Sequence, residues 1–261
     1  MSHAIDMSLQ IVQTGHDDAF RPSRPGVVQR ELGLDAASAG LFRARRVKVT
    51  GDWLPQASTL DPNAWYTLIY ILDGFVTVQL DGLDVSLCRF DAVSQVPLTS
   101  DNVVALSPTL EFFELTAPDD ARVRALIPDK PARTLAPDAP ELHVRGTGPR
   151  DFFDYRDLGV ANITRRQLEV QVIRAQRARE GGTGWHSHTM AQLSYGLSGW
   201  ASLGVEGLDQ PVIQAPGDAL CIPPGRIHNA DAFSSDYAAL QLQIPADYDT
   251  TPRADPRRVV A

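Results

Sequence analysis

Hydrophobic and polar residues alternate along most of the chain, in short runs that end at glycine, proline, aspartate or asparagine. The clearest runs are WYTLIYIL, FVTVQL, LEVQVIRA, WASLGVEG and YAALQLQI. Alternation over such lengths predicts β-strands with one buried face. Regular turn signals between many short strands are typical of a sandwich or a barrel. The pattern therefore predicts an all-β fold.

Two stretches depart from this alternation. GVVQRELGLDAASAGLF, residues 26–42, has the best helical periodicity in the chain and predicts one short helix. Residues 127–151 contain five prolines, a density that cannot continue a helix or a central strand. We interpret this second stretch as a linker or a crossover at a strand edge. The basic run FRARR, residues 42–46, is interpreted as the solvated start of a strand.

The two halves of the chain resemble each other. YILDGFVTVQLDGLD, which starts at Tyr70, lies over YGLSGWASLGVEGLD, which starts at Tyr195, at an offset of 125. Val47 matches Val172 at the same offset, and FDAVSQVPLTSDN lies over GDALCIPPGRIHN at an offset of 127. The alternative is chance matching in β-rich sequence, but the register holds over a turn, two strands and a later Asp-Ala pair. The repeat therefore predicts a duplicated domain.

Composition narrows the class of protein. The 261 residues allow one large domain or two ordinary ones, and 43% of them are hydrophobic, enough for a substantial core. The net charge of −8 argues against nucleic acid or an anionic membrane as a partner. No secretory signal or apolar run of membrane-spanning length is visible, and the two distant cysteines suit a reducing compartment. We therefore expect a cytoplasmic protein without a nucleic-acid or membrane partner.

Two of the six histidines lie one residue apart in the segment GWHSHTMAQLSYGLSG. On a strand, His186 and His188 point to the same face, and Gln192 shares their parity. A third histidine, His228, follows PGDALCIPPGRI. Three imidazoles suit several transition metals, whereas without a metal each buried imidazole would need its own hydrogen-bond partner. The remaining histidines are interpreted as ordinary core or surface residues.

The spacing around these histidines resembles the two motifs of the cupin superfamily. The first motif runs His-x-His, three or four residues, Glu, six residues and Gly; here it reads His186-Ser-His188, Thr-Met-Ala, Gln192, six residues and Gly. The second runs Gly, five residues, Pro-x-Gly, two residues and His; here it reads Gly217, DALCI, Pro-Pro-Gly, Arg-Ile and His228. The resemblance covers about residues 170–245, and the first half of the chain is reached only through the internal repeat.

The sequence departs from the cupin pattern at three positions. Gln192 occupies the place of a glutamate that usually ligates the metal. Ala232 occupies the place of an asparagine at the end of the second motif, which puts a minor structural contact in doubt. Glu180 stands at the opening glycine of the first motif, with three glycines close behind it. None of these departures removes a histidine.

The resemblance implies two tandem cupin jelly-roll barrels, the double-stranded β-helix, and so a bicupin. We expect a degenerate N-terminal domain over residues 1–135 and a metal-binding C-terminal domain over residues 136–261. The implied metal ligands are His186, His188 and His228, with Gln192 as a weak fourth ligand or a hydrogen-bonding neighbour. The repeat offsets place no histidine at the equivalent positions of the first half, which are Asp61, Asn63, Thr67 and Asp101. The first barrel is therefore predicted to be structural.

The resemblance also implies an enzyme that acts on a small molecule. Neutral ligands leave the full dipositive charge on a metal, which favours anionic oxygen ligands and lowers the pKa of bound water. We expect one divalent transition metal, Fe(II) first and otherwise Mn, Ni, Zn or Cu, with Gln192 as the catalytic side chain beside it. The expected activity is that of a dioxygenase acting on an enolisable or aromatic oxygen-bearing substrate, as in three-histidine cupin dioxygenases. The alternatives are a non-redox isomerase, decarboxylase or lyase, and a non-catalytic binding protein. The architecture further implies a homodimer.

Five other side chains near the motifs are interpreted as structural. Tyr195 has the opposite parity to the histidines and is expected to pack outward. Cys221 is expected to be a small buried residue. Arg174 lies on the preceding strand, within reach of an anionic substrate, but a structural role is favoured for it too. Trp185 and Trp200 are expected to be core or interface aromatics.

Overall fold

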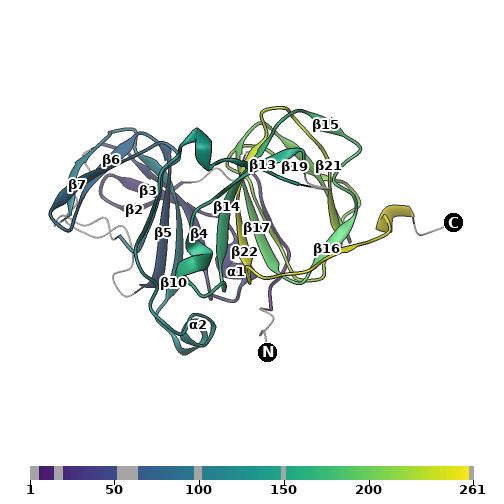
Figure 1. Ribbon diagram of the computed structural model, residues 1–261, viewed down its shortest axis with the longest axis horizontal. Coiled ribbons are helices and arrows are strands. Elements are labelled where there is room, and N and C mark those ends of the chain that lie inside the picture. The colour runs from purple at the N-terminus through teal and green to yellow at the C-terminus, as the bar shows by residue number, and fades with distance from the viewer. Residues whose placement is uncertain (1–5, 15–19, 52–63, 97–101, 148–150, 259–261) are drawn as a thin grey trace.

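The computed structural model describes residues 6–14, 20–51, 64–96, 102–147 and 151–258. Within these residues the chain forms two β-barrels that stand side by side (Figure 1). Each barrel combines a large seven-stranded sheet with a smaller one, and every strand pair whose register is recorded is antiparallel. The prediction of an all-β fold is confirmed.

In the described part of the chain, the first barrel consists of two sheets. Its large sheet has the order β11 (Thr134–Ala136), β8 (Ala92–Ser94), β5 (Ala64–Asp73), β10 (Glu111–Pro118), β4 (Arg43–Val49), β3 (Val27–Glu31) and β2 (Arg21–Arg24). Its small sheet has the order β7 (Leu83–Cys88), β6 (Phe75–Leu80) and β9 (Val103–Leu106).

The second barrel repeats this arrangement. Its large sheet has the order β1 (Gln10–Val12), β20 (Ala219–Ile222), β17 (Ala191–Ser198), β22 (Ala238–Ile244), β14 (Glu169–Ala175), β13 (Phe153–Asp157) and β12 (Val144–Arg145). Its small sheet has the order β19 (Val212–Gln214), β18 (Ala201–Val205), β21 (His228–Phe233), β16 (His186–His188) and β23 (Thr250–Pro252), with β15 (Arg179–Glu180) also paired to β21.

The strand ladders confirm the internal repeat and correct one match within it. Tyr70 in β5 lies opposite Phe113 in β10, as Tyr195 in β17 lies opposite Leu240 in β22. The next strand places Arg46 opposite Phe113 but Val172 opposite Leu240. Val172 is therefore equivalent to Arg46, and the match of Val47 with Val172 was wrong by one residue. A slip of one residue reverses the face of every side chain on a strand, so only the ladder fixes it.

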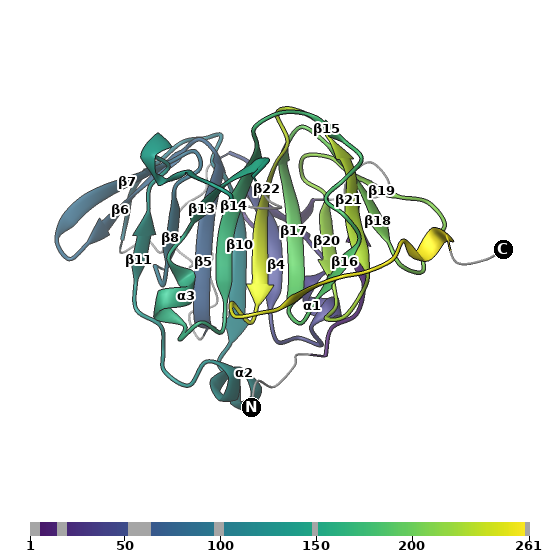
Figure 2. The ribbon, with the colours of Figure 1, turned by 45° about the vertical axis from the view of Figure 1, so that its right-hand side comes forward.

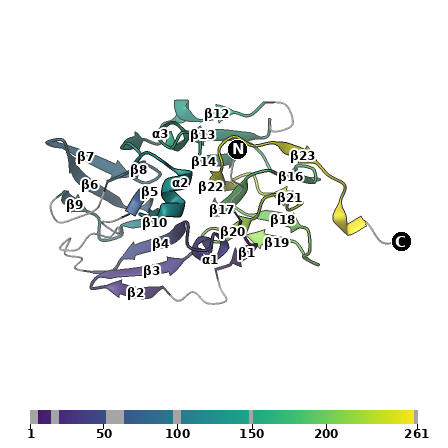
Figure 3. The same cartoon turned by 90° about the horizontal axis from the view of Figure 1, so that it is seen from below.

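The two barrels exchange their outermost strands. The N-terminal strand β1 pairs with β20 of the second barrel, and Figure 3 shows the two side by side. Conversely, β11 follows the first barrel in sequence and closes its large sheet by pairing with β8. The chain therefore contributes to the second barrel before it builds the first. The predicted division at residue 135 falls inside β11 and stays a prediction.

The main hydrophobic core lies between the two large sheets. It draws on one face of β5 and β10 in the first barrel and of β14, β17 and β22 in the second. The rings of Phe113 and Tyr195 meet there across the two sheets at 5.4 Å. Because side chains on a strand alternate between faces, the residues between these core positions point into the barrels. The interior of the first barrel is filled by a separate hydrophobic cluster.

The predicted helix over residues 26–42 was wrong in extent. Residues Val27–Glu31 form β3, and only Leu34–Ala37 form a helix, α1. Gly33, with φ of 80°, lets the chain turn sharply between the two elements. The same turn recurs before α3 (Val160–Ile163), where ELGL is replaced by DLGV at an offset of 126. The apolar spacing that resembled a helix therefore came from a strand followed by one turn.

The remaining helical elements are short. Helix α2 (Ala121–Leu126) begins at Asp120, whose carboxylate accepts hydrogen bonds from the backbone of Arg122 and Val123. In the described part of the chain, 3-10 turns occur at Pro140–Leu142 and Pro256–Arg258. Among the described residues, no helix is long and apolar enough to cross a membrane.

The proline-rich and basic segments take defined places at the sheet edges and inside the first barrel. Residues 127–151 contribute β11 and β12, each the last strand of its large sheet, as a strand-edge crossover predicts. The basic run starts β4, but it is not simply solvated. Arg45 forms an ion pair with the fully buried Glu114, and Arg46 forms one with Glu111. Alternation places Arg45 inside the barrel, which the basic composition of the run concealed.

Candidate metal centre

The three histidines predicted as metal ligands meet on the small sheet of the second barrel. His186 and His188 are the first and last residues of β16, and His228 begins β21 directly opposite His186. The ring centroids lie 4.7 Å, 4.5 Å and 5.1 Å apart in the three pairs. One ring nitrogen of each histidine lies within 4.8 Å of the other two. Among the described residues, these side chains form the cluster that is able to hold a metal ion.

Hydrogen bonds orient each ring through its Nδ1 atom. His186 Nδ1 donates to the carbonyl of Gly184 at 2.6 Å, and His228 Nδ1 donates to the carbonyl of Arg226 at 3.0 Å. A carbonyl only accepts, so both rings carry their proton on Nδ1 and present the Nε2 lone pair. His188 Nδ1 lies 2.9 Å from the Thr250 hydroxyl. Such bonds to the outer nitrogen fix the tautomer of metal-ligating histidines, so the donor set fits a divalent transition metal.

The histidine strand is covered by the C-terminal segment. Strand β23 pairs with β16 so that Thr250 faces His188 and Pro252 faces His186. The segment crosses from β22 to β16 in Figure 2, and Figure 3 shows β23 beside β16. Arg253 then donates to the hydroxyl of Ser187 at 3.0 Å. One histidine of the cluster therefore contacts a residue 62 positions away in sequence.

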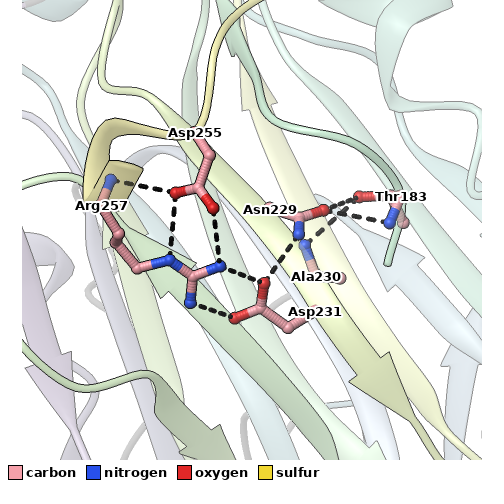
Figure 4. A network of polar contacts seen from close by, with 6 residues as sticks. All are labelled: Thr183, Asn229, Ala230, Asp231, Asp255 and Arg257. Atoms are coloured by element: carbon pink, nitrogen blue, oxygen red, sulfur yellow. Dashed lines mark hydrogen bonds and ion pairs between the residues drawn. The ribbon is translucent and has the colours of Figure 1, made fainter. Parts of the chain in front are cut away.

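A polar network anchors the end of this segment to β21 (Figure 4). Both terminal nitrogens of Arg257 lie 3.1 Å from the carboxylate oxygens of Asp231, and Arg257 also bonds Asp255. Asp231 accepts a bond from Asn229, and the amide oxygen of Asn229 holds Thr183. The guanidinium of Arg257 also lies 4.5 Å from the ring centroid of Trp185. These contacts attach the tail to both strands that carry the histidines.

Gln192 points into the second barrel, as its parity predicts. Its neighbours Ala191 and Leu193 pack in the core between the barrels, so Gln192 faces the other way. The side chain is 8% exposed and makes no hydrogen bond within the described part of the chain. Its role as a metal ligand or a neighbour of the metal stays a prediction.

Two further polar residues, Tyr248 and Gln243, extend from the histidine cluster. The ring of Tyr248 lies 5.3 Å from that of His188, edge to face. Gln243, which is 1% exposed, donates to the Tyr248 hydroxyl at 3.4 Å. On β22, Gln243 lies directly opposite Gln192 on β17. Sequence analysis missed both residues, although the alternating polar positions in YAALQLQI indicated that two glutamines face inward.

The side chains interpreted as structural have structural contacts. Tyr195 packs in the core between the barrels, where burial raises its pKa to about 12. Cys221 is fully buried on the same face, and burial raises the pKa of its thiol to about 12. Arg174 forms an ion pair with Asp138. Trp185 stacks against the tail as described above, and Trp200 is 45% exposed.

Part of the equivalent region of the first barrel lies outside the residues that the structure describes. Asp61, Asn63 and Asp101 lie outside the described residues. Thr67, the counterpart of Gln192, is buried, and its backbone and hydroxyl both bond the amide oxygen of Gln95. The described interior of this barrel is apolar apart from the Arg45–Glu114 pair and a few hydroxyl groups.

Comparison with solved structures identifies the fold. The chain matches the protein Ylba from E. coli (TM-score 0.59, 12% identity, 95% of this chain and 94% of that one). It matches procruciferin, the 11S globulin of Brassica napus (TM-score 0.63, 9% identity, 95% and 86%). It also matches a cupin 2 conserved barrel domain protein from Leptotrichia buccalis (TM-score 0.55, 10% identity, 92% and 99%). Protein-family models and curated protein sequences give no match.

These matches, together with the paired barrels, confirm the predicted bicupin fold, with a three-histidine cluster in the C-terminal half. Identities of 9–12% extend the likeness to the fold and no further. The fold hosts many unrelated activities, so function has to be argued from the histidine site.

Proposed function

We propose that this bicupin is a metal-dependent oxygenase, in which His186, His188 and His228 hold one divalent transition metal, Fe(II) first. Its substrate would be a small enolisable or aromatic molecule that binds through oxygen. The observation that carries the proposal is the set of three converging imidazoles, each held through Nδ1, with no carboxylate among them. Three protein ligands leave coordination positions open, which is typical of catalytic rather than structural metal sites.

The metal, the groups that orient the histidine rings and Gln192 would have different roles in the reaction. A bound metal would supply a Lewis-acidic centre able to bring O₂ and an oxygen ligand together. The carbonyls of Gly184 and Arg226 and the hydroxyl of Thr250 hold the ring orientations. Neutral ligands leave the charge of the metal uncompensated, which favours an enolate or phenolate over a neutral ligand. Gln192 would bind the metal weakly or hydrogen-bond a group on it.

The proposal is tested by oxygen consumption. The protein is purified without chelators, loaded with Fe(II) and mixed with a panel of β-diketones and phenols in an oxygen electrode. The proposal expects O₂ uptake coupled to substrate loss, and none from His228→Ala. Turnover of the same substrates under strictly anaerobic conditions would reject the oxygenase in favour of a non-redox metalloenzyme. Binding without turnover in either atmosphere would favour a binding protein.

The role of Gln192 is tested separately with Gln192→Glu. A carboxylate is the better ligand for a divalent metal. If residue 192 lies within reach of the metal, we expect the variant to bind Fe(II) more tightly and to lose affinity for enolate ligands, because one unit of charge is neutralised. Unchanged affinity for both metal and enolates would show that the side chain lies beyond the reach of the metal.

A further inference from the structure

The large sheet of the second barrel carries four glutamines on its inner face. Gln171 lies on β14, Gln192 on β17, and Gln241 and Gln243 on β22. The residues that alternate with them on these strands pack in the core between the barrels, so all four amides face inward. We call these four residues the amide wall.

Strand pairing joins the amide wall into two adjacent rows. In one row Gln192 lies directly opposite Gln243, and in the other Gln171 lies opposite Gln241. Gln171 donates to Gln241 at 3.4 Å within its row. The first row lies next to the histidines, because Gln243 bonds the Tyr248 hydroxyl and the Tyr248 ring contacts His188. The wall is therefore continuous with the metal centre.

The first barrel fills the same ladder positions with side chains of different chemistry. Thr67 and Thr116 are paired where the second barrel pairs Gln192 and Gln243, and Thr67 is bonded to Gln95. Arg45 and Glu114 are paired where the second barrel pairs Gln171 and Gln241, and they form an ion pair. The first barrel therefore carries no pair of facing glutamines at these positions.

The row of Gln192 and Gln243 contains amide atoms without protein partners in the described ranges, whereas Gln171 and Gln241 bond each other. Gln192 is buried and has no hydrogen bond within the described part of the chain. The Oε1 atom of Gln243 is buried and has no partner among the described residues. Turning that amide by 180° would exchange its two ends but still leave one end without a partner. A buried polar atom without a partner costs free energy, so the Gln243 oxygen is poised to bond a ligand, and the amide of Gln192 directly opposite can bond the same ligand.

The charges on this face select against anions. The row of Gln192 and Gln243 continues with Ile222 on one side and Glu169 on the other, with no lysine or arginine in it. Burial and the nearby carboxylates of Asp157 and Asp247 raise the pKa of Glu169, against the opposing charge of Arg166. A ligand carboxylate here would accept hydrogen bonds but donate none, and no lysine or arginine within the row would compensate its charge.

We propose that the amide wall binds the uncharged polar part of a ligand whose other end reaches the histidines. That part presents a hydrogen-bond donor beside an acceptor, as a carboxamide or a hydroxyl next to a carbonyl does. An amide supplies one donor and one acceptor direction of its own, so such a group pairs with Gln243 and Gln192 together. The inference rests on the proposed function for the metal end of the ligand and adds the chemical class of the other end.

The experiment compares two probes of the same shape, 3,4-dihydroxybenzamide and 3,4-dihydroxybenzoate. Both are titrated calorimetrically into the full chain loaded with Zn²⁺, which binds oxygen ligands without redox chemistry. We expect the benzamide to bind at least about 10-fold more tightly, since a site built for a donor rejects an analogue that lacks it. Gln243→Met keeps the length of the side chain and should bring the affinity ratio close to one. Thr116→Val, at the equivalent buried position of the first barrel, is the matched control and should keep the wild-type ratio.

Equal affinities in the wild type, or tighter binding of the benzoate, would overturn the inference, as would a Gln243→Met variant that keeps the preference. If that variant fails to fold, Gln192→Met replaces it, because the ratio of two affinities cancels any common loss of metal. Failure of Zn²⁺ to bind the wild-type chain would overturn the proposed function instead. The preference is then measured with benzamide and benzoate on the metal-free chain, where the same ratio is expected and its absence overturns the inference.

Discussion

Thr250 offers a sensitive test of how the tail of the chain controls the metal centre. The substitution Thr250→Val keeps the shape of the side chain and removes the hydroxyl that lies 2.9 Å from His188 Nδ1. When Nε2 of His188 binds a metal, Nδ1 must carry the proton and donate it to this oxygen. Without the hydroxyl, the buried imidazole, which is only 7% exposed, loses that acceptor.

The size of the effect follows from the exposure of the two partners. An unsatisfied buried donor costs about 1–3 kcal/mol. Removing the hydrogen bond to the outer nitrogen of a metal-ligating histidine typically weakens metal binding about 10–100-fold. Thr250 itself is exposed, so water can replace part of the lost bond. We therefore expect a loss at the lower end of that range, about 10-fold in the affinity for Zn²⁺ or Co²⁺.

Competition titration with a chromophoric chelator measures this loss. Thr251→Val is the matched control, because Thr251 lies next in the same strand, is exposed and faces Ser187 instead of a histidine. Thr250→Ser should restore the affinity. In the metal-free protein, nitrogen NMR should show that His188 loses its Nδ1-protonated tautomer in the valine variant. Equal metal affinities for the two valine variants would refute the assignment of Thr250 as a positioning residue.

Three further predictions concern the rest of the molecule. Glu114→Ala removes the ion-pair partner of Arg45, whose side chain is nearly buried. It should therefore lower the free energy of unfolding, measured by urea denaturation, by about 3 kcal/mol; an unchanged midpoint would contradict this. Thiol titration of the native protein at pH 8 should label the exposed Cys88 quickly and the buried Cys221, whose pKa is raised to about 12, only after unfolding; equal rates would be the contrary result. For Asp138, burial opposes ionisation, but a histidine and two arginines outweigh it and hold its pKa below 3.8. The ionised carboxylate therefore stabilises the fold above that pH, and this stabilisation is lost as the pH falls through the lowered pKa. Asp138→Asn should make the free energy of unfolding less dependent on pH in the acid range, and an unchanged dependence would count against this reasoning.

The sequence predicted the features that depend on local spacing. His186 and His188 share a face because they are two residues apart on a strand, and the motif spacing placed His228 with them. The internal repeat predicted the second barrel for the same reason, since turns and alternating strands leave a local signature. Gln192 was placed on the inner face by parity alone.

Features that depend on distant pairing were not predictable in this way. Nothing in the segment around Thr250 indicates that it pairs with the histidine strand, because strand pairing is fixed by the register of the whole barrel. The exchange of β1 and β11 between the barrels has the same origin. The helix expected over residues 26–42 failed because a strand followed by a single turn gives apolar spacing similar to that of a helix.

The central claim is that His186, His188 and His228 together hold one metal ion. Elemental analysis of protein purified without chelators tests it directly, with the wild type compared to His186→Ala and His228→Ala. We expect about one transition-metal ion per wild-type chain and a large loss in both variants, which should remain folded because their large sheets are untouched. Full metal content in both alanine variants would contradict it.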